Sequence, residues 1–353
     1  MATGSSWKMA REELVKISIA DATERASRAL RAVGYSEDDA ATICAHIMDA
    51  QLRGYGPTGV ARILTIANLL KQQRSNKLVG SDDMVVTRER PASAQLDAKG
   101  AIGYLAAHRA TALAIAKAKA TGGVGVVGVS DTFYAGMLSY YAEMCTRQDL
   151  VALIIASAGP WVAPEGSSTP RFGTNPMCIA FPSGTRRPVI WDIGTSKITH
   201  AQVKLAQLMG EDLPEGTAFD KDGNPSRDPF KALPEDGGAM AVWGGHKGSG
   251  LAIAIQLLGA LAGAPAHTAN DHGWGLLVIA MDPEMFRPID DFKREVDTYS
   301  DTIRASQPLK GNGPIRMPFD RSWETRERTR EGGFVEVERS VLEGLQKLID
   351  GAK

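Results

Sequence analysis

The loop at residues 52–62 carries the residue types most suited to chemistry in this sequence. Its three glycines and one proline lie between two helical patterns, and Arg53 and Arg62 flank the hydroxyl of Thr58. Glycine and proline shape an exposed loop through its backbone, and guanidinium groups bind anions well. This loop is therefore a candidate anion site.

A second candidate anion site lies at residues 244–250, where glycines surround His246 and Lys247 just before an apolar run from Leu251 to Ala264. Free N–H groups at a helix start and a lysine ammonium together attract an anion. The alternative is a glycine-rich helix start with Lys247 in solvent, and the residues alone do not separate the two. The apolar run is shorter than the roughly 20 residues of a membrane span, so it predicts a buried helix.

The spacing G-x-G-x-x-G also occurs, at Gly123, Gly125 and Gly128. In a dinucleotide-binding fold this motif follows a strand and opens a helix, so that the pyrophosphate meets free helix N–H groups. Here a predicted helix precedes the glycines, and valines fill the positions between them, as in a strand. The sequence therefore argues against a Rossmann fold.

The composition is that of an ordinary globular protein, and the length predicts two domains. The 353 residues are 43% hydrophobic and 23% charged, and the net charge of −1 offers no electrostatic attraction for nucleic acid or an anionic membrane. The three cysteines form no C-x-x-C pair, which favours reduced thiols, a cytoplasmic location and no metal site. The first ten residues lack the apolar segment of a secretory signal.

Hydrophobic periodicity and turn residues predict alternating helices and strands. Helices are expected at residues 20–32, 37–53, 63–70, 100–120, 140–145, 251–264, 283–306, 321–330 and 340–349. Strands are expected at residues 15–19, 124–129, 151–156, 177–181, 189–192, 276–280 and 313–318. Ser36 is the expected N-cap of the second helix, and the charged run at 321–330 is expected to face solvent.

In their order and spacing, several stretches resemble the type-2 malate/L-lactate dehydrogenase family, from about residue 12 to about residue 348. They are Arg53-Gly54, Gly59-Val60-Ala61-Arg62, Gly173-Thr174-Asn175-Pro176, Asp192 with Thr195-Ser196, and His246-Lys247-Gly248 with Gly250-Leu251. The resemblance implies a non-Rossmann α/β fold with mixed sheets flanked by helices. It also implies NAD or NADP as cofactor, a small carboxylate substrate and a homodimer.

Two interleaved domains are expected on the same grounds. Residues 1–125 with 305–353 would form a helical, substrate-side domain, and residues 126–304 a cofactor-binding α/β domain. Pro318-Phe319-Asp320 is a loosened match to a late Pro-Gly-Glu of the family. The resemblance assigns the cofactor to Gly173, Thr174, Asn175, Asp192, Ile193, Gly194, Thr195, Ser196, His246, Lys247, Gly248, Pro318 and Asp320.

This chain departs from the family pattern at two positions where histidines are usual, and has Thr58 and Tyr134 there instead. Hydride transfer to a carbonyl needs a proton donor for the developing alkoxide, ideally with a pKa near the working pH. A threonine does not meet this need, whereas a tyrosine can if a nearby cation or dipole lowers its pKa from about 10.

Each of the three candidate catalytic residues therefore has two interpretations. Tyr134 is either the proton donor or an apolar packing residue, and Thr58 either bonds a substrate oxygen or fills the turn. Arg62 either clamps a substrate carboxylate, as matching arginines do in the family, or forms a surface ion pair.

Three functions are compatible with these residues. The first is an NAD(P)-dependent oxidoreductase for a small 2-oxo, 2-hydroxy or 2-imino acid, and a protonated imine would suit the missing histidines because it needs no strong acid. The second is a same-fold enzyme acting on a bulkier or aromatic substrate, or a lyase or isomerase without net redox. It is motivated by Pro57, Ala135 and Ile66, which make the expected pocket more apolar. The third is a non-catalytic binding protein.

Overall fold

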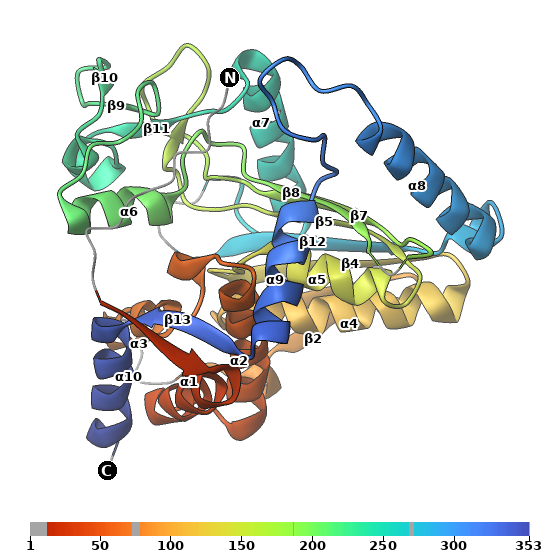
Figure 1. Cartoon of the computed structure of the whole chain (residues 1–353), viewed down its shortest axis with the longest axis horizontal. Helices are drawn as coiled ribbons and strands as arrows, with labels where there is room; N and C mark the ends of the chain where they lie inside the picture. The colour runs from red at the N-terminus through yellow and green to blue at the C-terminus, as the bar shows by residue number, and fades with distance from the viewer. Residues whose placement is uncertain (1–12, 73–77, 186, 268–271, 353) are drawn as a thin grey trace.

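The computed structural model describes residues 13–185 apart from 73–77, and residues 187–352 apart from 268–271. Its largest element is a seven-stranded mixed sheet in the order β2-β3-β4-β12-β5-β7-β8 (Figure 1). Neighbouring strands run antiparallel except β3 and β4, which are parallel. The strands are β2 (Val85–Arg90), β3 (Ser93–Asp97), β4 (Val124–Thr132), β5 (Val151–Ala156), β7 (Met177–Phe181), β8 (Val189–Ile193) and β12 (Trp274–Met281).

Helices cover both faces of this sheet, because its central strands are apolar on both sides. In β12, Leu276 belongs to the main core and Leu277 to a second core. The main core lies against α4 (Gly103–Thr121) and α5 (Leu138–Thr146), and the second core lies against α7 (Gly245–Leu261). Successive side chains of a strand point to opposite faces, so one strand serves two cores. Figure 1 shows α4 and α5 on one side of the sheet and α7 on the other.

The two ends of the described chain meet in a second layer, where β1 (Leu14–Ser18) pairs antiparallel with β13 (Phe334–Glu338). Figure 1 shows these red and blue strands side by side. The helices of this layer are α1 (Ile19–Val33), α2 (Glu37–Leu52), α3 (Arg62–Gln72) and α10 (Arg339–Gly351). The expected N-cap of α2 is confirmed, because the Ser36 hydroxyl accepts a hydrogen bond from the N–H of Asp39.

A third layer holds a small sheet in the order β10-β9-β11-β6 together with α6 (His200–Met209). Its strands are β6 (Val162–Ala163), β9 (Ala218–Phe219), β10 (Pro225–Ser226) and β11 (Ala239–Ala241). The remaining helices are α8 (Ile289–Arg304) and α9 (Asp320–Gly332), and the 3-10 helices are η1 (Gly56–Thr58), η2 (Ser81–Asp83), η3 (Pro229–Lys231), η4 (Pro234–Asp236) and η5 (Pro283–Met285).

Some elements differ from the sequence expectations. Residues 313–318, expected as a strand, form no regular secondary structure, whereas the β2–β3 hairpin and α6 were not expected. The helix expected at 283–306 is broken into η5 and α8, with Pro288 as the N-cap of α8.

The argument against a Rossmann motif is confirmed. Gly125 and Gly128 lie inside β4, where no helix begins. A Cβ atom on Gly125 would lie 1.9 Å from the carbonyl oxygen of Ala114 in α4. This glycine therefore allows a helix and a strand to approach closely.

The expectation of a fully buried apolar helix at 251–264 is wrong for one face. Ile255 of α7 is buried, but Leu257 and Leu261 are 58% and 75% exposed. An apolar stripe of this kind on the outside of a helix marks a surface suited to a partner.

Two charged residues also lie where the sequence did not place them. Arg326, from the run expected to face solvent, is 1% exposed and donates hydrogen bonds to Glu143 at 2.8 Å and to Asp49 at 3.0 Å. Arg53 joins the same buried network, at 2.6 Å from Asp49 and 2.5 Å from Glu143. Two carboxylates thus compensate the charge of Arg53 inside the protein, although its Nη1 has no hydrogen-bond partner among the described residues. Arg53 also does not line the cavity described below, so the expectation that it helps to bind an anion there is wrong.

The proposed domain boundaries stay a prediction. The boundary at residue 125 falls within β4, and β2 and β3 complete the sheet of the proposed cofactor domain. Residues 305–353 contribute β13 and α10 to the layer that contains the start of the described chain, in keeping with an interleaved arrangement.

Candidate active site

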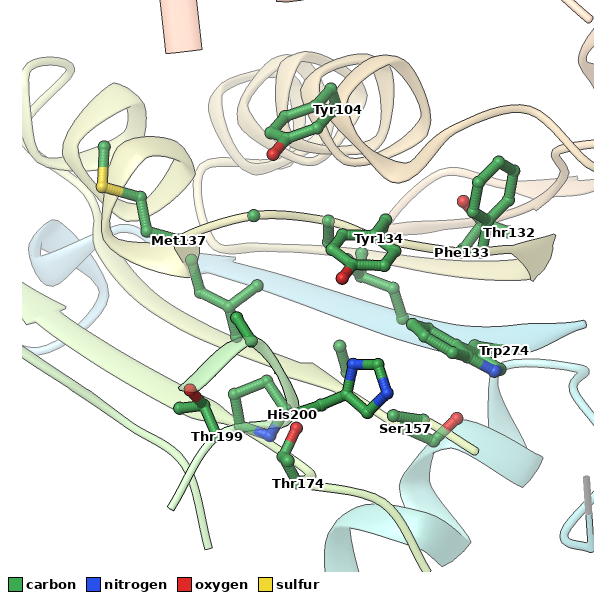
Figure 2. A pocket seen from close by; sticks show the side chains of 18 of the residues that line it. Tyr104, Thr132, Phe133, Tyr134, Met137, Ser157, Thr174, Thr199, His200 and Trp274 are labelled. Carbon is green, nitrogen blue, oxygen red and sulfur yellow. The ribbon is translucent and has the colours of Figure 1, made fainter. Parts of the chain in front are cut away.

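A cavity of about 230 Å³ lies where residues of the three layers converge. Arg62 enters it from α3, Tyr134 from the loop after β4, Trp274 from β12 and His200 from α6. Figure 2 shows the hydroxyl of Tyr134 and the ring of His200 facing the same space, with Trp274 beside them. The structure thus brings Arg62 and Tyr134, two of the predicted catalytic residues, into one pocket.

Arg62 and Tyr134 are in direct contact. Arg62 is only 6% exposed, and its Nη1 donates a hydrogen bond of 2.9 Å to the phenolic oxygen of Tyr134. Its guanidinium carbon lies 4.5 Å from the centroid of the same ring. Because the oxygen already accepts from a cation, the phenolic proton is free to be donated to another acceptor. The surface ion pair considered for Arg62 is excluded by its burial.

Four buried polar atoms of residues that line this cavity have no hydrogen-bond partner among the described residues: Arg62 Nε, Tyr104 Oη, His200 Nδ1 and Trp274 Nε1. An arginine nitrogen can only donate, and burial raises the pKa of Tyr104 to about 12, so that this phenol keeps its proton. Buried donors are rarely left unpaired in folded proteins. The cavity is therefore suited to a ligand rich in acceptor oxygens, such as a carboxylate.

Thr58, the third predicted catalytic residue, lines the same cavity at the end of η1. Its hydroxyl donates a 3.0 Å hydrogen bond to the carbonyl oxygen of Tyr55 and thereby closes the turn. This bond uses the hydroxyl proton within the loop, which leaves the oxygen's acceptor capacity for a ligand. Ile66 does not line the cavity and is buried in the core, so the expectation that it makes the pocket more apolar is wrong.

His200 is a site residue that the sequence did not reveal. It is the first residue of α6, and its ring stacks on Trp161 with centroids 4.3 Å apart and an interplanar angle of 19°. Burial lowers the pKa of His200 to about 4, and the nearby cations Lys204 and Arg62 act in the same direction. The imidazole is therefore neutral at pH 7. The only local signal was the capping box of Thr199 and Gln202, which marks a helix start but not its place beside the cavity.

The loop that carries Tyr134 is held in a strained conformation. Tyr134 itself has a φ of +52°, which is unusual for a residue with a side chain. Two residues later Gly136 has a φ of +70°, and a Cβ there would lie 2.5 Å from His46 Nε2. His46 Nε2 in turn accepts a 3.1 Å hydrogen bond from the N–H of Met137. His46, which lies within the helix expected at 37–53, is 1% exposed and supports this loop.

The predicted cofactor segments meet beside the cavity. Thr174 lines it, and the N–H of Thr195 donates to the carbonyl oxygen of Thr174 at 2.8 Å. The N–H of Trp243, just before α7, donates to the carbonyl oxygen of Thr195 at 2.8 Å. Asn175 reaches α7 directly, because its Nδ2 donates to the carbonyl oxygen of Ala252 at 2.9 Å. Residues 172–176 and 244–250 therefore border one region.

Asp192 and Pro318 line a second cavity of about 350 Å³, which also contacts Met137 of the Tyr134 loop. The Asp192 carboxylate accepts a 2.8 Å hydrogen bond from the N–H of Ser139. Burial raises its pKa, although this hydrogen bond lowers it in part. Asp320 does not line this cavity. Its carboxylate is paired with Arg304 at 3.0 Å, and its assignment to the cofactor stays a prediction.

The segment at the start of α7 fits a phosphate-bearing cofactor. No side chain caps the first turn, and His246 and Lys247 within it are exposed. Nearby, Ser196 Oγ is buried without a hydrogen-bond partner among the described residues, and Ser196 forms a β-bridge with Val242. Free N–H groups, an ammonium and a buried hydroxyl provide the donors that phosphate oxygens need. The remaining predicted contacts, Gly173, Ile193, Gly194 and Gly248, belong to the same segments.

Comparison with known proteins places this fold and site in one family. The model of the malate/L-lactate dehydrogenase family matches residues 17–346. The chain belongs to this family and is an oxidoreductase, as the sequence resemblance predicted.

The relatives act on different carboxylic acids, according to their names. L-sulfolactate dehydrogenase of Methanocaldococcus jannaschii is 34% identical over 90% of this chain and 92% of its own length. The Δ1-pyrroline-2-carboxylate/Δ1-piperideine-2-carboxylate reductase of Pseudomonas putida is 30% identical over 90% and 92%. The solved sulfolactate dehydrogenase of M. jannaschii superimposes with a TM-score of 0.82 at 30% identity, covering 96% of this chain and 97% of that one. A lyase or isomerase has no support among these relatives.

Two other kinds of site are absent from the described residues. None of the helices combines the length and hydrophobicity needed to cross a membrane. No group of three or more His, Cys, Asp or Glu side chains suited to a metal ion is found in the same part of the chain.

Proposed function

We propose that the chain reduces the C=O or C=N bond of a 2-oxo or 2-imino carboxylic acid with NADH or NADPH, and catalyses the reverse oxidation. Arg62, a buried residue that lines the cavity, binds the substrate carboxylate through guanidinium N–H groups that Tyr134 does not use. This places the neighbouring carbonyl or imine carbon beside Tyr134 in the cavity of Figure 2. Thr58 Oγ1 and Tyr104 Oη are within the same cavity and complete the polar part of the pocket.

Tyr134 takes the role of the missing histidine. When hydride reaches a carbonyl carbon, the oxygen becomes an alkoxide, and the phenolic proton of Tyr134 moves to it. The resulting phenolate lies 2.9 Å from Arg62 Nη1, whose charge stabilises it. This contact between Arg62 and Tyr134 is the observation that carries the proposal.

The cofactor contacts are assigned to residues that border the cavity. Thr174, Thr195 and Ser196 lie between the cavity and α7, and His246 and Lys247 face solvent at the first turn of α7. When bound, a nicotinamide cofactor supplies or accepts the hydride. The chain's own residues orient the substrate carboxylate and hold the proton at Tyr134 Oη.

Tyr134→Phe tests this division of roles. The phenylalanine variant keeps the ring but loses the proton, so kcat/KM for 2-oxo acids should fall by about 10²- to 10⁴-fold. A cyclic imine that is already protonated needs no such donor, so its reduction should change far less. Both substrate types are assayed with NADH and NADPH, and calorimetry measures the binding of each nucleotide.

Wild-type selectivity completes this test. Wild-type preference for cyclic imines would fit the loss of both histidines, whereas clear preference for 2-oxo acids would count against an imine substrate. Unchanged reduction of 2-oxo acids by Tyr134→Phe would exclude Tyr134 as the donor. A matched control is Tyr299→Phe, because Tyr299 is an exposed residue of α8 that does not line the cavity.

The family resemblance also suggests a homodimer, and the outer face of α7 supports this part of the proposal. Ile253, Leu257 and Leu261 form an exposed apolar stripe on this helix. A cytoplasmic location is proposed from the cysteines, since Cys44, Cys145 and Cys178 are all free thiols. Sedimentation of wild type and Leu257→Glu would test the dimer, which should dissociate in the variant.

A further inference from the structure

We propose that the preferred substrate is a monocarboxylic 2-oxo acid, or its hydroxy or imino counterpart, whose side chain is a large flat ring. This inference rests on the proposed function and specifies the substrate class of the same site. It differs from malate and sulfolactate, each of which carries a second anionic group.

Several of the residues that line the cavity with Arg62 and Tyr134 are aromatic. Trp161 stacks on His200 at 4.3 Å and meets Trp274 edge-on, with centroids 5.3 Å apart and an interplanar angle of 86°. Trp274 also lies 6.3 Å from the ring of Tyr134, with an interplanar angle of 30°. Phe133 lines the same space. Such rings offer flat surfaces and edges on which another ring stacks favourably.

The charges around the cavity suit a single anionic group. Arg62 is the one arginine or lysine that lines it among the described residues, and His200 is neutral at pH 7. The next cation outward, Lys204, is paired with Glu235 at 2.6 Å. A second carboxylate or sulfonate would therefore lose its hydration without gaining a free cation.

The space available is larger than a small side chain needs. The cavity continues into a groove of about 810 Å³ between α3, α6 and α10, and Arg62, Tyr134, Trp161, His200 and Trp274 line both. The outer walls of the groove carry apolar side chains, namely Leu64, Leu69, Leu205 and Val341. A ring attached to a carboxylate held by Arg62 would extend from the aromatic residues into this apolar groove.

The first test compares substrates that share one reaction but differ in side chain. Phenylpyruvate, pyruvate, oxaloacetate and sulfopyruvate are each assayed as substrates of the wild-type chain, with NADH and with NADPH. Phenylpyruvate should show the highest kcat/KM, at least tenfold above the two dianionic acids. Among unreactive carboxylates, 3-phenylpropionate should inhibit at concentrations at least tenfold lower than succinate. Higher kcat/KM for oxaloacetate or sulfopyruvate would overturn the inference.

The second test changes one of these aromatic residues. Trp161→Ala removes the indole, so the ratio of kcat/KM for phenylpyruvate to kcat/KM for pyruvate should fall at least tenfold. Trp161→Phe keeps an aromatic surface and should restore most of the phenylpyruvate activity. Such a recovery would show that Trp161→Ala loses activity because the aromatic surface is missing, and not because the protein misfolds. Equal losses for both substrates in both variants would overturn the inference.

Failure of the substrate inference can be told apart from failure of the proposed function. If pyruvate or a dianionic acid is reduced well, the reaction class stands and only the aromatic preference fails. If none of the acids is reduced and neither NADH nor NADPH binds in calorimetry, the proposed function itself is contradicted. The inference of an aromatic substrate, which rests on it, is then contradicted as well.

Discussion

Arg62 holds Tyr134 by two contacts at once, a 2.9 Å hydrogen bond from Nη1 to the phenolic oxygen and the packing of its guanidinium against the ring at 4.5 Å. The planar fork of an arginine can do this and still have further N–H groups to donate to a carboxylate. In the proposed mechanism, one cation thus serves substrate binding and proton transfer together. This arrangement would let the site work without the two histidines that the sequence resemblance leads us to expect.

Replacing Arg62 by lysine should therefore impair both roles. A lysine keeps the charge but offers a single ammonium, which cannot reach the phenolic oxygen and a carboxylate in the same geometry. Losing a hydrogen bond to a charged group costs about 1.5–3 kcal/mol, so kcat/KM should fall about 10- to 100-fold. Steady-state kinetics measures this, and unchanged kcat/KM would refute the clamp. Arg316→Lys is a matched control, because Arg316 does not line the cavity.

Gly136→Ala should disturb the loop that carries Tyr134. A Cβ at this position would lie 2.5 Å from both His46 Nε2 and Tyr104 Cε1, and the φ of +70° adds backbone strain. We expect a lower melting temperature and a loss of kcat, because the loop must move to relieve the clash.

Gly122→Ala is the matched control for this change. Gly122 has a similar φ of +61°, but a Cβ there would meet nothing within 4 Å. It should lose about 1 kcal/mol of stability from backbone strain and keep its activity. Equal kcat in the two variants would show that the position of the Tyr134 loop does not limit turnover.

The sequence could identify the family and most of the sheet, but it could not separate residues of one type that end in different environments. Arg53 and Arg62 lie nine positions apart in the same loop region, yet Arg53 is neutralised by Glu143, which is distant in sequence. His200 was missed because its partner Trp161 belongs to another segment. Only the tertiary packing of these segments decides which side chain faces the cavity.

Features that depend only on residues close in sequence were predicted correctly. The N-cap at Ser36 and the strand Met177–Phe181 are found as expected, because a cap or an apolar run bounded by turns depends on neighbouring residues. The burial of Arg326 could not be foreseen, since its charge is compensated by α2 and α5 rather than by its own helix.

Glu143→Gln should destabilise the protein without touching the cavity. Glu143 binds both Arg53 and Arg326 inside the protein, so the variant leaves two buried guanidinium groups short of a counter-charge. Removing one partner of such a buried network costs about 3–5 kcal/mol, and denaturant unfolding should show it. Glu13→Gln, in an exposed pair with Arg339, should cost far less, because solvent screens this pair. Equal costs for the two variants would show that the buried network contributes little.

His46 should make folding stability depend on pH. Burial lowers its pKa to about 3 from an ordinary value of 6.5, with Arg53 and His108 acting in the same direction. Between these two pH values the unfolded chain binds a proton that the folded chain does not. This histidine therefore contributes a loss of stability as pH falls below 6.5, by about 1.4 kcal/mol per pH unit.

His46→Gln tests this, because glutamine keeps an oxygen that can accept from the N–H of Met137 but does not titrate. At pH 8 the variant should be less stable than wild type, since it packs less well among Tyr104, Tyr140 and Tyr141. Toward pH 5 the difference should shrink, because only the wild type loses stability through this group. Urea unfolding at pH 8, 6.5 and 5 measures the two slopes. Parallel slopes would mean that His46 titrates alike in the folded and unfolded chains, and its role as a neutral acceptor for the Tyr134 loop would then be untenable.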